Sequence, residues 1–279
     1  MLRPYILMLF LLSSSAFANC PSRPFNYPST LRIEEPAVLI VTHAASGFDA
    51  RIASKRGVDE AVAFARRSNI PVVYLEDDDQ PETYFARECE PDYRILSEGG
   101  ELPLDIHAGE VYVVGGHLEM CLSQTLHDVL LSWSHHAQPR QRMTFFMDGI
   151  YSNGKSIQAE DPYYESFSRF MNIVTYGRPG GETWPKLTLL ETLGVIAVPD
   201  QIYDYLQRVL PHYARTLPPS YRVELVLNDE APRVLQKGSG RKAPLFQFHF
   251  VDSALTLDDE PGKPAPSKAQ PRVGATADK

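Results

Sequence analysis

Cys121 is the residue of this sequence best placed to act as a nucleophile. It follows an apolar run, residues 111–114, and two glycines, and it stands in the first turn of a predicted helix. The positive end of a helix dipole favours the thiolate form of a cysteine, which is the reactive form. A thiol at the carboxyl end of a strand also stands where open α/β sheets bind their ligands. The segment therefore predicts a ligand pocket with a nucleophilic sulfur.

Other side chains could assist this thiol. His43 follows the apolar run 37–42 and is a candidate general base, because a Cys–His pair is sufficient to form a thiolate. The alternative for His43 is a buried imidazole that only makes a hydrogen bond. Arg94 could stabilise an anion, although an arginine cannot shuttle a proton at neutral pH. The candidate substrate-binding residues are Gly116, His117 and Arg87.

The sequence leaves the redox state of Cys121 open. The chain has three cysteines, and in an oxidising compartment an odd number leaves one thiol over. A Cys20–Cys89 disulfide would leave Cys121 reduced, whereas Cys89–Cys121 would block it. We favour the first pairing slightly, because it leaves the thiol at the helix start reduced. Cys121 could also be a small buried residue without chemistry.

Metal ligation is not expected. No pair of potential ligands has the spacing of a zinc motif among His117, Glu119, Asp49 and the pair His135-His136. We expect the His135-His136 pair at a solvated helix end, and we expect no metal and no other cofactor.

Alternating strand and helix patterns predict the frame that positions Cys121. The fold class expected is α/β, a doubly wound and mostly parallel sheet with helices on both faces. Residues 80–109 have little periodicity, so we expect mostly loop there. The predicted strands are 37–42, 70–75, 111–114, 143–147 and 195–198, and the predicted helices are 54–67, 119–133, 187–192 and 200–217.

A different pattern begins near residue 219. Residues 221–227 and 245–251 have strand character, and Phe246, Phe248 and Phe250 alternate with polar residues. We expect a small C-terminal antiparallel appendage with these aromatic side chains in its core. A surface for a protein partner is the alternative.

The N-terminus has the features of a secretory signal peptide. Arg3, an apolar core at residues 5–12 and the Ala16-Phe17-Ala18 site predict cleavage after Ala18, and the apolar run is too short to span a bilayer. We therefore expect a periplasmic or secreted bacterial protein with no membrane attachment after cleavage. The expected layout is signal peptide 1–18, Pro-rich lead-in 19–36, α/β domain 37–218 with an insertion at about 150–186, β appendage 219–253 and disordered tail 254–279.

Charge and composition narrow the partners. The net charge is -8 at pH 7 and no basic stripe is present, which argues against nucleic acid. With nucleic acid disfavoured, a small-molecule ligand or a protein remains as the partner class. A hydrophobic content of 43% is enough for a sizeable core. The oligomeric state is left open.

The segment Cys121, Thr125 and Asp128, after a strand and two glycines, resembles the nucleophile segment of the isochorismatase-like family of cysteine hydrolases. Asp148-Gly149 resembles the aspartate that closes the family's next strand, and residues 189–198 resemble its last helix–strand passage. The resemblance implies an α/β hydrolase of small-molecule amides that works through a cysteine, an aspartate base and a supporting lysine.

Two of those three groups are replaced or missing. His43 stands where the resemblance implies the aspartate, five residues before Phe48, and no lysine occurs between Lys55 and Lys155. The first hypothesis is therefore an exported protein with a degenerate catalytic set that binds a small molecule or a protein. The alternative is an active, non-standard cysteine hydrolase with Cys121 as nucleophile, His43 as base and Arg94, or else Arg87, as the cation.

Overall fold

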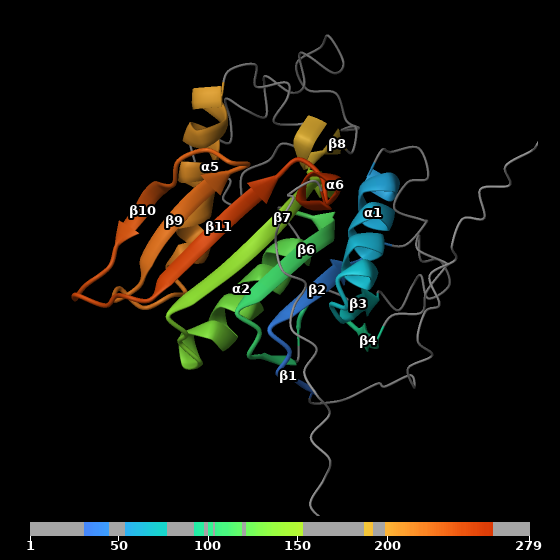
Figure 1. Ribbon diagram of the computed structural model, residues 1–279, viewed down its shortest axis with the longest axis horizontal. Coiled ribbons are helices and arrows are strands. Elements are labelled where there is room, and N and C mark those ends of the chain that lie inside the picture. The colour runs from blue at the N-terminus through green and yellow to red at the C-terminus, as the bar shows by residue number, and fades with distance from the viewer. Residues whose placement is uncertain are drawn as a thin grey trace, which may run out of the picture.

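A computed structural model describes residues 31–44, 54–76, 92–97, 100–102, 104–118, 121–152, 187–191 and 199–258. The described strands form a nine-stranded, mostly parallel sheet with helices on both faces (Figure 1). The predicted α/β fold class is therefore confirmed.

The main sheet has the strand order β10-β9-β11-β7-β6-β2-β3-β4, and β8 pairs with β7. Neighbours from β9 to β4 are parallel, whereas β10 runs antiparallel to β9 and β8 antiparallel to β7. A separate two-stranded parallel sheet pairs β1 with β5. The strands are β1 (Leu31–Ile33), β2 (Ala37–Thr42), β3 (Val72–Glu76), β4 (Tyr93–Leu96), β5 (Leu104–Ile106), β6 (Glu110–His117), β7 (Arg140–Ser152), β8 (Leu187–Thr188), β9 (Arg222–Leu227), β10 (Arg233–Lys237) and β11 (Leu245–Val251).

The helices divide between the two faces of the sheet. Helix α1 (Ser54–Arg67) covers one face and packs on Val114 and Phe146. Helices α2 (Cys121–His135) and α5 (Pro199–Ala214) cover the other (Figure 1). Because β2 and β3 are buried on both faces, their sequences are nearly continuous apolar runs. A short helix, α6 (Leu255–Asp258), falls in the segment expected to be disordered.

Several predicted boundaries differ from the structure. The expected loop 80–109 contains β4 and β5, strands of four and three residues that are too short to show a period. Strand β7 does not end at Asp148-Gly149 but continues through a register shift to Ser152. The expected helix 187–192 begins instead with strand β8, and of its described residues 189–191 are helical.

The C-terminal strands are part of the main sheet. Strands β9 and β11, from which an antiparallel appendage was expected, pair parallel to each other, and β11 also pairs parallel with β7. Antiparallel pairing at this end is confined to β9 with β10 among the described strands. The expected burial of Phe246, Phe248 and Phe250 is confirmed, since all three side chains lie in the core.

Some predictions lie outside the described residues. These are the signal peptide, most of the lead-in and of the insertion, the strand 195–198 and the tail beyond Asp258. In the part of the chain that the structure describes, no helix is long and apolar enough to cross a membrane.

Candidate functional site

The carboxyl ends of β2 and β6 meet where the connections of the sheet change face. The two strands are parallel neighbours, with Thr42 opposite Gly115. The chain continues from β2 to α1 on one face and from β6 to α2 on the other (Figure 1). Doubly wound sheets bind ligands in the crevice at such a switch point. His43 and Cys121 follow these two strands, so the fold brings both candidates to this edge.

Cys121 is the first residue of α2, and it is half-buried. The first N–H groups of an α-helix have no intrahelical acceptor and carry partial positive charge, which favours an anion at this position. Gly116 has a φ of +51°, and a Cβ there would lie only 3.2 Å from Cys121 Sγ. A side chain at position 116 would therefore crowd the sulfur.

The hydroxyl of Thr125 links three backbone segments beneath Cys121. Thr125 is fully buried, and its Oγ1 lies 2.7 Å from Gly100 O, 3.2 Å from Cys121 O and 3.2 Å from Thr42 Oγ1. A threonine hydroxyl donates one proton and accepts through its lone pairs. The shortest distance makes Gly100 O its main acceptor, and Thr42 can then donate to Thr125. The end of β2 and the start of α2 are thereby tied together.

Residues 100–102 lie against the first turns of α2. Gly100 has a φ of +84°, and a Cβ on it would be 2.2 Å from Cys121 O. Leu102 N donates to Asp128 Oδ2 at 2.8 Å, and Gln124 Nε2 donates to Asp128 Oδ1 at 3.0 Å. Thr125 and Asp128 therefore position this segment beside the candidate nucleophile. Gly100 gave no signal in the sequence, because it lies in a stretch without periodicity.

His43 is held by both its backbone and its ring. Its φ is +45°, its side chain is buried, and its N–H donates to Leu75 O at 3.0 Å. The ring Nε2 lies 2.5 Å from Ser97 O. A carbonyl oxygen only accepts, so Nε2 carries the proton and Nδ1 is the nitrogen left to accept one. The imidazole thus makes a buried hydrogen bond to the end of β4.

Arg94 forms an ion pair with a buried carboxylate. It lies on β4, and its Nε is 3.1 Å from Oε1 of Glu76 on the adjacent strand β3, whose side chain is 3% exposed. A carboxylate at that depth is costly without a cation. Neutralising Glu76 is therefore the contact that the structure gives Arg94. Its suggested role as the cation beside Cys121 stays a prediction.

The remaining predicted site residues are only partly described. Gly116 lies at the site, but the His117 side chain and all of Arg87 are outside the described residues. Cys20 and Cys89 are outside them too, so the suggested disulfides stay predictions.

Asp148, expected to close a strand near the site, lies in the register shift of β7 on the α1 face. Here α1 presses on β7, because a Cβ on Gly57 would be 2.3 Å from Asp148 O. The pKa of Asp148 is raised to about 6, mainly by burial; a hydrogen bond with Ser253 opposes this rise, and the charge of Glu60 contributes to it. A carboxyl group with this pKa exchanges its proton near neutral pH.

Residues that could bind a metal gather elsewhere. Among the described residues, the group of three potential ligands is Asp105, His107 and His136. These residues come just before β6 and just after α2, so they lie at the amino edge of the sheet, opposite Cys121.

Comparison with known proteins gives a likeness of fold. No family model and no curated protein matches the sequence. Similar solved structures include N-carbamoylsarcosine amidase from Thermoplasma acidophilum (17% identity over 51% of this chain and 94% of that one, TM-score 0.32), an isochorismatase from Pseudomonas putida (15%, 49% and 79%, 0.33) and a cysteine hydrolase from Pseudomonas syringae (13%, 58% and 92%, 0.32). Their names are those of the isochorismatase-like cysteine hydrolases, which the Cys121 segment resembles. The identities and TM-scores are too low to assign the activity of these proteins to this chain.

Proposed function

We propose that the switch-point site around Cys121 binds a small molecule and lacks the proton-transfer machinery of a thiol hydrolase. The observation that carries this is the hydrogen bond between His43 Nε2 and Ser97 O at 2.5 Å. A general base must accept the thiol proton. Nε2 donates to this carbonyl and cannot do so, and the buried ring, which that bond anchors, cannot readily turn to exchange its two nitrogens.

The state of Arg94 supports the same proposal. A cation can stabilise a thiolate only if its charge is not already balanced. Arg94 is paired with the buried Glu76, and releasing it would leave that carboxylate uncompensated. Two features of the site do not depend on proton transfer. Gly116 has no side chain to crowd Cys121, and the N–H groups at the start of α2 can donate hydrogen bonds. Both suit the binding of an uncharged or anionic small molecule.

Hydrolysis of a panel of primary amides, measured as ammonia release, tests the proposal. We expect no turnover by the wild-type protein above that of Cys121→Ala. Turnover that disappears in Cys121→Ala would overturn it.

A second candidate, an active non-standard cysteine hydrolase, is favoured by one observation. With its proton on Nε2, His43 has Nδ1 as its basic nitrogen, and Cys121 lies at a helix start. The rate of Cys121 alkylation by iodoacetamide separates the two candidates. If His43 only packs, His43→Gln leaves the rate within about twofold, whereas the loss of a base slows it about 100-fold or more. A slowing of that size in a folded variant would favour the hydrolase.

Export and a protein partner belong to the proposal as well. The signal-peptide features support a periplasmic or secreted location, and the intact mass of the purified protein tests whether cleavage follows Ala18. Because the three phenylalanines of β11 are buried, a protein partner at the C-terminal strands would use the edge strand β10, where Val234 is exposed.

A further inference from the structure

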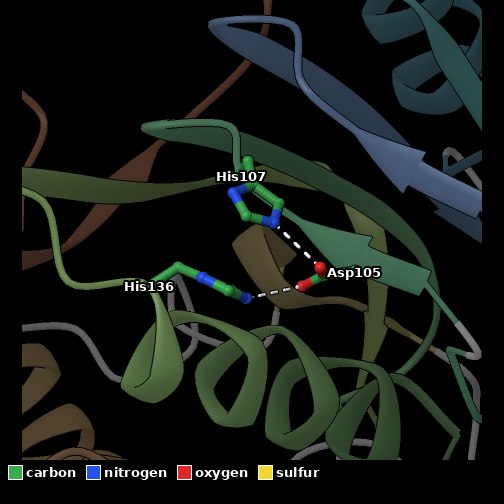
Figure 2. Close-up of side chains that lie close together, drawn as sticks. All are labelled: Asp105, His107 and His136. Carbon is green, nitrogen blue, oxygen red and sulfur yellow. Dashed lines mark hydrogen bonds and ion pairs between the residues drawn. The ribbon is translucent and has the colours of Figure 1, made fainter.

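Three potential metal ligands converge at the amino edge of the sheet. Asp105 belongs to β5, His107 follows it by two residues, and His136 comes directly after α2 (Figure 2). His107 Nε2 lies 2.8 Å from Asp105 Oδ2, and His136 Nε2 lies 3.0 Å from Asp105 Oδ1. The three ligand atoms are all within 4.8 Å of one another. The carboxylate thus lies between two imidazoles that both present Nε2.

From these contacts we infer that Asp105, His107 and His136 form a binding site for a divalent transition metal of the zinc type. Imidazole nitrogen and carboxylate oxygen are ordinary zinc ligands, with bonds of about 2.0–2.2 Å. Ligand atoms around a tetrahedral ion are then about 3.3–3.5 Å apart. The two N···O distances need to open by only a few tenths of an ångström to reach that spacing. Water from the open side would complete the coordination.

The surroundings hold the ligands in place. Ser132 Oγ donates to Asp105 Oδ1 at 3.2 Å and accepts from Ile106 N at 2.8 Å, which fixes the carboxylate against α2. Such contacts orient metal ligands and tune their affinity. The backbone of both histidines is fixed by glutamine amides, since Gln138 donates to His107 O and Gln141 to His136 O.

The electrostatics also suit a cation. The His107 and His136 rings lie 4.0 Å apart between centroids, which is unfavourable if both are protonated. A cation, Arg32, also contacts the cluster, with its Nη2 3.5 Å from His107 Nδ1. Arg32 is exposed and paired with Glu34, so it can move away when Nδ1 takes up the proton.

Access from solvent is open at this site. The side chains of Asp105, His107 and His136 are 44%, 18% and 38% exposed. A bound ion would join β5 to the end of α2, about 20 Å from Cys121 given 15 helical residues at 1.5 Å each. The inference is therefore independent of the function proposed for Cys121.

Zinc binding to the full mature chain tests the inference. Titration of the chelator-treated protein with ZnCl2, in a Cys121→Ala background that removes the helix-start thiol, is expected to show one ion per chain. His107→Gln and His136→Gln should each weaken binding at least about 10-fold. The matched control is His135→Gln, because His135 is an exposed neighbour outside the cluster. It should bind as the parent does.

Thermal unfolding supplies a second readout. Zinc should raise the Tm of the parent and of His135→Gln but not that of His107→Gln or His136→Gln, because only a ligand that binds the native state stabilises it. Circular dichroism of each variant without zinc establishes that it folds. Absence of binding by the parent, or binding unchanged in both cluster variants, would overturn the inference.

Discussion

Thr125 donates its buried hydroxyl to the carbonyl oxygen of Gly100 at 2.7 Å, and this bond joins the first turns of α2 to a segment 25 residues earlier in the chain. The same hydroxyl faces Thr42 at the end of β2. The geometry around Cys121 therefore depends on a polar contact within the protein interior.

Thr125→Val should lower the free energy of unfolding by about 1–3 kcal/mol, because it leaves the buried Gly100 carbonyl without its donor. Urea unfolding measures the loss. Thr125→Ser keeps the hydroxyl and should cost less. A larger loss in Thr125→Ser than in Thr125→Val would show that the methyl group, and not the hydrogen bond, matters at this position.

Gly115→Ala should be severely destabilising. Gly115 has a φ of +85°, and a Cβ on it would lie 2.2 Å from Thr42 O. The matched control is Gly240→Ala, since Gly240 has a φ of +107° but nothing within 4 Å of its Cβ position. We expect a loss of about 1–2 kcal/mol for Gly240→Ala from backbone conformation alone. The loss for Gly115→Ala should exceed about 3 kcal/mol, and similar losses at the two positions would refute the close packing of β2 on β6.

Asp148 should make the protein less stable as the pH rises from about 4 to about 6. Burial raises the pKa of Asp148 to about 6 in the folded protein, above its value of 3.8 in the unfolded chain. Between these values the folded state binds more protons, so the free energy of unfolding falls with increasing pH.

Asp148→Asn should remove this dependence. The variant is expected to be more stable than the wild type above pH 6, with a difference that shrinks toward pH 4. Urea unfolding at a series of pH values measures it. Asp204→Asn on the exposed side of α5 serves as the surface control. A difference of the same size at every pH would rule out titration of Asp148 as its cause.

Arg94→Met should cost about 3–5 kcal/mol of stability, because it leaves the buried Glu76 carboxylate without its cation. Adding Glu76→Gln should restore part of that loss, since the uncompensated charge is then gone. A double-mutant cycle by urea unfolding gives the coupling between the two positions. Additive losses would mean that the ion pair between Arg94 and Glu76 contributes nothing to stability.

Local sequence patterns predicted the part of the fold that local physics determines. Strand 37–42 and helix 54–67 follow from a continuous apolar run and a helical stripe, which report burial directly. The position of Cys121 at a helix start also follows from the glycines and the apolar run before it. Placing His43 and Cys121 at one edge required only that the strands before them lie parallel in one sheet.

Contacts between distant segments were decided only by the tertiary structure. The alternation in 245–251 identified the buried face of β11 but not its parallel pairing with β7 and β9, because side-chain period carries no information about strand partners. His136 meets Asp105 across 31 residues of chain, and no spacing rule covers that separation. The sequence by itself therefore determined most of the strands and helices and the place of Cys121 in the first turn of α2. Packing in three dimensions decided what faces those residues, because ion pairs and hydrogen bonds depend on distance in space and not along the chain.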